Sequence, residues 1–174
     1  GKGGEVSVEF AYIDLAFAPW LSVRSGMLLV PLGIVNEKHE PTTFPGTMRP
    51  AVERLILPST WRTIGAGILG EAMPGLSYRL YAVEGLSAAG FSGAEGIRGG
   101  RQSGARALAE PFALAARLEY SPFLGTLIGG GLYAGNSGQG ARDSLGDINA
   151  RTIVATVHGE MSWRGLELRA LYAV

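Results

Sequence analysis

The sequence contains no cysteine, which excludes disulfide bonds, thiolate chemistry and cysteine-ligated metal sites. It has no apolar run of about 18 residues, the length that a transmembrane helix needs. Lysine is scarce, since thirteen arginines are accompanied only by Lys2 and Lys38. The formal net charge is zero, so the totals give no electrostatic reason to expect a nucleic-acid partner.

Apolar residues and glycine are abundant. The 174 residues are 47% hydrophobic and 17% charged, against about 25% charged in a typical soluble domain. This composition predicts a folded chain, long enough for one domain or a large part of one. The sequence begins with GKGGEVSVEF, which has neither an initiator Met nor the apolar region of a signal peptide. We therefore expect either a processed start or an internal portion of a longer protein.

Eight segments alternate apolar and polar residues with period two, as β-strands do. The clearest segments are 21–29, 76–83, 112–120, 151–161 and 165–173, and the weaker ones are 5–12, 63–71 and 126–135. The parity of the first segment slips from Ile13 onward, which suggests a β-bulge. The outward face of the glycine-rich segment 126–135 stays open at this point.

The connections between these segments alternate in length. Short ones fall at 18–20, 73–75, 121–123 and 163–165, and long ones at 31–61, 86–110 and 135–150. This pattern predicts one antiparallel up-and-down sheet over residues 1–174. A β-propeller needs four strands per repeat, whereas two are found here.

Short turns at one end and long loops at the other are typical of transmembrane β-barrels, whose strands run about 9–11 residues. Alternation alone leaves open which face is inside. The membrane interpretation is favoured by the loop asymmetry and by the low lysine content of the polar faces. Aromatic residues also lie near strand ends, where an interfacial girdle places them: Trp20, Trp61, Tyr120, Trp163 and Tyr172.

Residues 8–44, VEFAYIDLAFAPWLSVRSGMLLVPLGIVNEKHEPTTF, resemble the phosphate-selective porin (O/P-type) family of Gram-negative outer-membrane porins. The similarity lies in the AYIDL strand, the tight turn after it, and Gly26, Pro31 and Gly33. The segments LPSTWRTIGAGILGE and LSYRLYAVEGL are similar to the next hairpin of such porins. The resemblance implies a homotrimeric outer-membrane channel of about sixteen strands, half of them present here. Such a channel passes small hydrophilic solutes, including anions such as phosphate, by passive diffusion.

Charged residues on the polar faces of the strands are the candidates for lining a pore. They are Arg24, Arg79, Arg117, Arg169, Glu9, Glu119, His158, Glu160 and Glu167. The arginines recur once per hairpin, and a row of arginines would guide anions. The alternative is ordinary lumen charge balanced by glutamate, which the zero net charge favours. His158 and Glu160 share a face, as a proton-sensitive pair or as part of a mixed polar wall.

The loop 31–61 contains five prolines, which restrict its backbone. We expect a short helix within 49–57 and a loop folded into the lumen, or alternatively one that covers the rim. The candidates for a constriction are Glu37, Lys38, Arg49, Glu53 and Arg54. A second short helix is expected within 103–110.

No motif for catalysis or cofactor binding is found. NEKHE (36–40) lacks the second histidine of a zincin motif, and residues 90–104 lack the Gly-Lys-Ser/Thr ending of a phosphate loop. There is no Gly-x-Ser-x-Gly elbow. We therefore expect no enzyme, metal site or cofactor. Two other functions stay open: a soluble or small closed β-barrel that binds an apolar ligand, and an adhesion or structural outer-membrane barrel.

Overall fold

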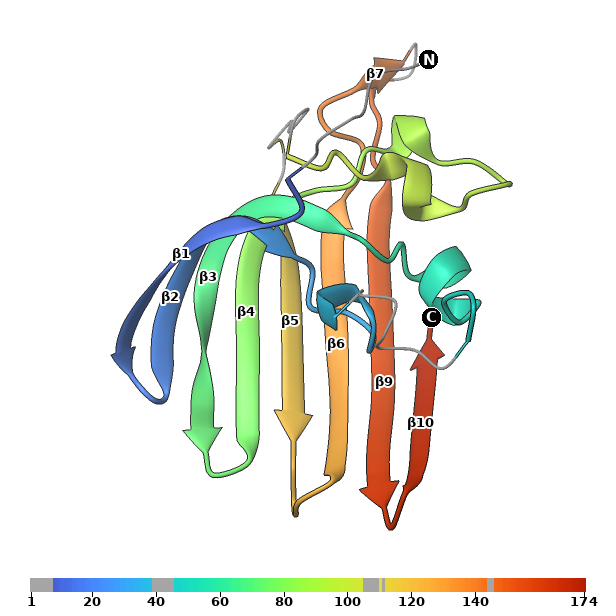
Figure 1. The fold of residues 1–174 in the computed structure, drawn as a ribbon. Coiled ribbons are helices and arrows are strands. Elements are labelled where there is room, and N and C mark those ends of the chain that lie inside the picture. The colour runs from blue at the N-terminus through green and yellow to red at the C-terminus, as the bar shows by residue number, and fades with distance from the viewer. Residues whose placement is uncertain (1–7, 39–45, 105–109, 111, 144–145) are drawn as a thin grey trace, which may run out of the picture.

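The computed structural model describes residues 8–38, 46–104, 110, 112–143 and 146–174. Eight antiparallel strands form one sheet in the order β1-β2-β3-β4-β5-β6-β9-β10 (Figure 1). The strands are β1 (Ala11–Ala18), β2 (Leu21–Leu29), β3 (Arg62–Met73), β4 (Leu76–Glu84), β5 (Phe112–Tyr120), β6 (Thr126–Asn136), β9 (Arg151–Trp163) and β10 (Leu166–Ala173). The eight predicted strands and their up-and-down order are confirmed.

One predicted strand boundary was wrong, and one predicted connection contains additional structure. The first strand begins at Ala11, so Phe10 and the residues described before it precede the sheet. The apolar parity changes at Ile13 because the residues before Ala11 lie outside the sheet, whereas the outward side chains of β1 include Ile13. The β-bulge lies later than predicted, between Ala16 and Ala18. The connection 135–150 also contains a small hairpin formed by β7 (Arg142–Asp143) and β8 (Gly146–Asp147).

All four tight turns lie at one end of the sheet, and the long connections leave from the other end (Figure 1). The strands do not close into a barrel. In the described part of the chain, β1 pairs only with β2 and β10 only with β9, so the sheet has two open edges. No helix among the described residues is long and apolar enough to cross a membrane.

The two faces of the sheet differ in what they expose. On one face, here called the outer face, large apolar side chains are accessible, among them Ile13 (70% exposed), Phe112 (67%) and Leu118 (54%). On the other, the inner face, Tyr81, Tyr133, Arg117 and His158 are buried. Alternation with period two separates the two sets, because neighbouring residues of a strand point to opposite faces.

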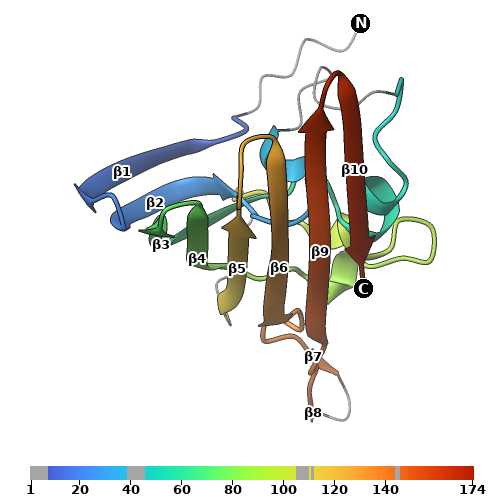
Figure 2. The ribbon, with the colours of Figure 1, turned by 90° about the horizontal axis from the view of Figure 1, so that it is seen from below.

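Residues 30–61 join β2 to β3 and are here called the inner loop; its described parts, 30–38 and 46–61, cover part of the inner face (Figures 1 and 2). It carries a 3₁₀ turn, η1 (Asn36–Lys38), and a π-helical turn, η3 (Val52–Ile56), which confirms the helix expected within 49–57. The next long connection carries the 3₁₀ turns η4 (Ala88–Gly90) and η5 (Ile97–Gly100). The helix expected within 103–110 falls largely on 105–109, outside the described residues.

Candidate functional site

The site is a cluster of charged side chains on the inner face, beneath the inner loop. Arg117 donates from Nη2 to Glu119 Oε1 at 2.7 Å and lies 3.0 Å from His158 Nε2. Arg79 donates from Nη1 to Glu119 Oε2 at 2.8 Å. Glu37 of the inner loop lies 3.5 Å from Arg79 and 3.8 Å from Arg117. These five residues, called the inner cluster below, are drawn from β4, β5, β9 and η1.

Strand register brings the cluster together. Arg79 of β4 pairs with Arg117 of β5, while Glu119 pairs with Gly129 of β6, which in turn pairs with His158 of β9. A Cβ at Gly129 would lie 2.8 Å from the His158 ring. The glycine therefore makes the space into which the imidazole turns toward Glu119.

The cluster fastens the inner loop to the sheet. Arg117 donates through Nη1 to the Gly33 carbonyl. Beside this contact Leu32 is buried, and a Cβ at Gly131 of β6 would lie 2.7 Å from its Cδ2 atom. The loop thus occupies the volume that side chains on β6 would otherwise fill.

Polar groups inside the loop hold its own shape. Glu53 is buried, and its carboxylate accepts hydrogen bonds from the Ile34 and Val35 amides. Burial raises the pKa of Glu53 above its ordinary value of 4.5, although these amides and the positive charge of Arg117 oppose the shift. Asn36 donates to the Val30 carbonyl at 2.7 Å and accepts from the Trp61 amide at 2.7 Å, which ties the two ends of the loop.

The long connections also contact one another. Arg101 donates to the carbonyls of Ser59 and Thr60, and Arg49 donates to the hydroxyls of the same two residues. Burial and neighbouring arginines lower the pKa of Arg101 to about 10. Three of the five constriction candidates therefore have different partners. Glu53 and Arg49 form hydrogen bonds within the loop, whereas Glu37 contacts the arginines of the inner cluster. Lys38 and Arg54 are exposed.

The other predicted pore-lining residues lie toward the two edges of the sheet. Arg24 on β2 forms two hydrogen bonds with Asp14 on β1, each 2.7 Å long. Arg169 on β10 lies 3.3 Å from Glu160 and 3.6 Å from Glu167. Glu9 is exposed and precedes β1.

Two points of the sequence interpretation change. His158 and Glu160 are not a pair, because His158 contacts Arg117 and Glu119 while Glu160 contacts Arg169. Asp14 was missed, since the parity slip of its segment hid which face it occupies. Asp14 and Arg24 lie at equal distances on either side of the tight turn, and this symmetry could have predicted that they pair. Within the described ranges, no group of three or more histidine or acidic side chains is placed to hold a metal ion.

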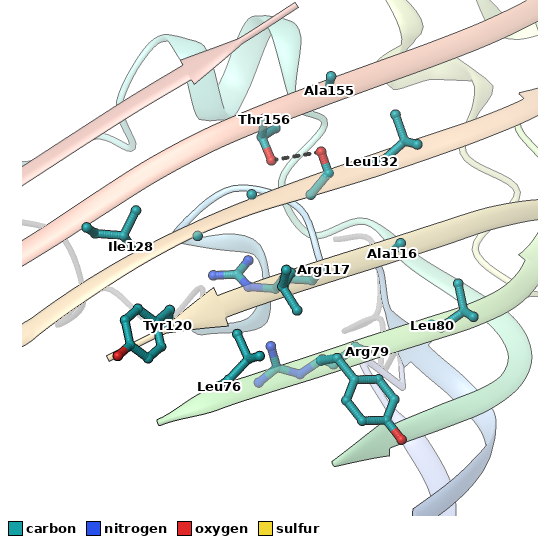
Figure 3. Close-up of a pocket in the computed structure, with 15 residues that line it drawn as sticks. Leu76, Arg79, Leu80, Ala116, Arg117, Tyr120, Ile128, Leu132, Ala155 and Thr156 are labelled. Atoms are coloured by element: carbon teal, nitrogen blue, oxygen red, sulfur yellow. Dashed lines mark hydrogen bonds between the residues drawn. The ribbon is translucent and has the colours of Figure 1, made fainter. Parts of the chain in front are cut away.

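The outer face carries a shallow apolar groove of about 720 Å³ across β4, β5, β6 and β9 (Figure 3). Leu76, Leu80 and Ile128 rim it. Its floor is low because Ala116 and Ala155 are small. The groove exposes almost no polar surface, so it offers no chemistry for a hydrophilic ligand.

Comparison with known proteins finds a similar sequence but no matching family model. The chain is 44% identical over 121 residues to an uncharacterized protein of Aquifex aeolicus. The alignment covers 68% of this chain and 28% of the relative, so the matched part spans less than a third of that protein. No family model matches the chain, and no solved structure matches it.

Proposed function

We propose that this chain forms part of an outer-membrane β-barrel channel of a Gram-negative bacterium, which passes small hydrophilic solutes by passive diffusion. The observation that carries the proposal is the polarity of the sheet: apolar side chains are exposed on the outer face, and charged ones are buried on the inner face. A soluble sheet with one solvated face carries polar side chains on that face. A membrane barrel turns its apolar face to lipid and its polar face to the lumen.

Lipid is the partner that the outer face fits. Exposed apolar area in water costs about 25 cal/mol per Å², and soluble monomers rarely expose a contiguous apolar patch above a few hundred Å². Trp20, Trp163 and Phe123 are exposed in or beside the tight turns, where an aromatic girdle would meet the membrane interface.

The two open edges support a larger barrel. Open strand edges do not occur within the hydrocarbon region, because unpaired backbone groups there have no water to bond. In the proposed barrel of about sixteen strands, β1 and β10 pair with strands outside these 174 residues. The aligned part is only 28% of the Aquifex relative, which leaves that protein room for further strands. The homotrimer implied by the porin resemblance is part of the same proposal.

A strong anion preference is not part of it. Each of the four inner-face arginines singled out from the sequence lies within 3.6 Å of at least one carboxylate: Arg24 with Asp14, Arg79 and Arg117 with Glu119, Arg169 with Glu160. If positive charge still governs permeation, Arg79→Ala in the full-length channel will move the reversal potential in a salt gradient away from anions. An unchanged potential excludes the arginine row as the selectivity device.

The test of the proposal is reconstitution of the full-length protein in planar bilayers. Stepwise single-channel conductance that scales with salt concentration is expected, together with a need for detergent during purification. A protein that stays monomeric in buffer without detergent overturns the membrane assignment. A protein that inserts as a barrel without conducting supports instead a structural or adhesion barrel.

A further inference from the structure

The inner loop contacts the inner face in two different ways along its length. Toward β5 and β6 the contact is closed. Val30 and Tyr133 are fully buried, Leu32 fills the space above Gly131, and the Trp61 and Tyr133 rings lie 4.6 Å apart. Arg117, with a side chain only 7% exposed, donates to the Gly33 carbonyl across this contact. Between these two strands and the described residues of the loop, the buried side chains leave no route for a solute.

Toward β10 the contact is open. A cavity of about 450 Å³ lies between the loop residues Ile34, Val52 and Glu53 and the β10 residues Glu167, Arg169 and Leu171. Two charged side chains here, Arg169 (35% exposed) and Glu167 (66%), are more accessible than Arg117 (7%) and Glu119 (10%) of the inner cluster, whereas Glu53 on the loop side of the cavity is buried.

We infer that solutes pass the inner loop on its β10 side, through this cavity, and that Arg117 and its neighbours anchor the loop without lining the path. The inference rests on the proposed channel function and locates the path within it. Seven of the nine candidate pore-lining residues, all except Arg24 and Glu9, then divide into two groups. Arg169, Glu160 and Glu167 face the permeating solute, whereas Arg79, Arg117, Glu119 and His158 hold the loop.

The walls of the cavity indicate the class of solute. Ile34, Val52 and Leu171 make one part of the lining apolar, and Arg169 with Glu167 makes another part charged with both signs. A volume of about 450 Å³ lies within the range of small-molecule pockets. Small solutes that combine a charged or polar group with an apolar portion fit this lining. Arg169 can exchange its carboxylate partners for those of a solute, because its side chain is accessible.

The absence of cysteine from these 174 residues allows a direct test, in a full-length protein whose other cysteines, where present, are replaced by serine. Leu171→Cys places a single thiol in the cavity, and Thr156→Cys, a swap of similar size, places one on the inner face of β9, where Thr156 is buried near Gly131. Each full-length variant is treated in a planar bilayer with a cationic methanethiosulfonate reagent while the current is recorded. Labelling of the same variants in detergent is followed by mass spectrometry.

Leu171→Cys is expected to label and to lose conductance. Thr156→Cys should label at least about tenfold more slowly, because a buried thiol reacts only after local opening. The current through this variant should persist. Block of Thr156→Cys, or an unchanged current in fully labelled Leu171→Cys, overturns the inference while the channel stands. If the wild-type protein inserts without conducting, the proposed function itself fails, and the untreated wild-type record shows this before any reagent is added.

Discussion

Glu53 is a charged residue type whose role here is structural, because it holds the inner loop in shape. Its carboxylate sits inside the inner loop, bonded to two amides of the same loop, and burial raises its pKa. The folded protein therefore holds this proton more tightly than the unfolded chain does. The contribution of Glu53 to stability is greatest at low pH and declines as the pH rises from about 4.5 through the higher folded-state pKa.

Glu53→Gln should remove this part of the pH dependence. The amide side chain keeps an oxygen for the Ile34 and Val35 amides but does not titrate. The free energy of unfolding, measured in detergent between about pH 4 and pH 8, should fall less steeply in this variant than in the wild type. Glu53→Ala, which has no acceptor, should be less stable than Glu53→Gln throughout. Identical pH slopes in Glu53→Gln and the wild type would contradict the assigned shift.

Gly67 is a second residue whose role depends on close approach. A Cβ at this position of β3 would lie 2.0 Å from the Leu80 carbonyl oxygen of β4, which a sheet cannot accommodate without moving a strand. Gly67→Ala should lower the free energy of unfolding by about 2 kcal/mol or more. Gly93 in an exposed loop has no atom within 4 Å of such a Cβ, so Gly93→Ala is the matched control and should change stability little. Equal denaturation midpoints for the two variants would contradict this account.

At the scale of elements, the inner loop depends on a residue of β5. Arg117 joins the Gly33 carbonyl to Glu119, and both charged side chains are largely buried. Removing one member of a buried pair leaves the other without compensation. Arg117→Ala should therefore cost about 3 kcal/mol of stability and should expose the loop to proteolysis.

The matched control is Arg54→Ala, which removes an arginine of the loop itself that is exposed to solvent. It should change stability by less than about 0.5 kcal/mol and leave the proteolysis pattern unchanged. Limited digestion followed by mass spectrometry locates the cuts. Cleavage within residues 30–61 that is equally slow in wild type and Arg117→Ala would show that the loop is held by other contacts.

The sequence predicts elements of this kind unequally well. Strands such as β5 were readable because Arg117 and Glu119 alternate with Leu114 and Leu118, and each local pair of neighbours shows the period. The face of β6 was not, because Gly129 and Gly131 carry no side chain to mark it. The contact of Glu37 with Arg79 joins residues far apart in the chain, and nothing in either segment encodes it locally. For the same reason the sequence did not show that Glu37 contacts the inner cluster whereas Glu53 forms hydrogen bonds within the loop.

At the scale of the whole molecule, the polarity of the sheet can be tested by one substitution. Leu80 is exposed on the outer face, at the middle of β4, where a soluble protein would tolerate arginine. In a membrane barrel, arginine at the bilayer midplane costs about 2–4 kcal/mol. Leu80→Arg should therefore lower the stability of the protein refolded into lipid vesicles by that amount.

Phe123 provides the comparison, because it is also exposed but lies in the tight turn between β5 and β6. Arginine near the membrane interface costs about 0–1 kcal/mol. Phe123→Arg should thus fold into vesicles nearly as well as the wild type. If Leu80→Arg is as stable as Phe123→Arg, the outer face does not lie in the hydrocarbon layer.

Closure of the sheet is the part of the architecture that local patterns could not supply. The alternation within β1 and β10 is the same whether each strand has one neighbour or two. An edge strand is completed by hydrogen bonds to a second neighbouring strand, and among the described residues no such strand pairs with β1 or β10.

Leu32 of the inner loop fits against β6 only because Gly131 has no side chain; a larger residue at position 131 would clash with it. The wall and the loop therefore cannot be exchanged independently, although Gly33 and Arg117, which also join them, are 84 positions apart. A graft of residues 30–61 into another sheet would meet side chains where this one has glycine. A foreign loop placed here would leave a hole above β6. Any chimera built from this protein must move the inner loop and the β5–β6 hairpin as one cassette.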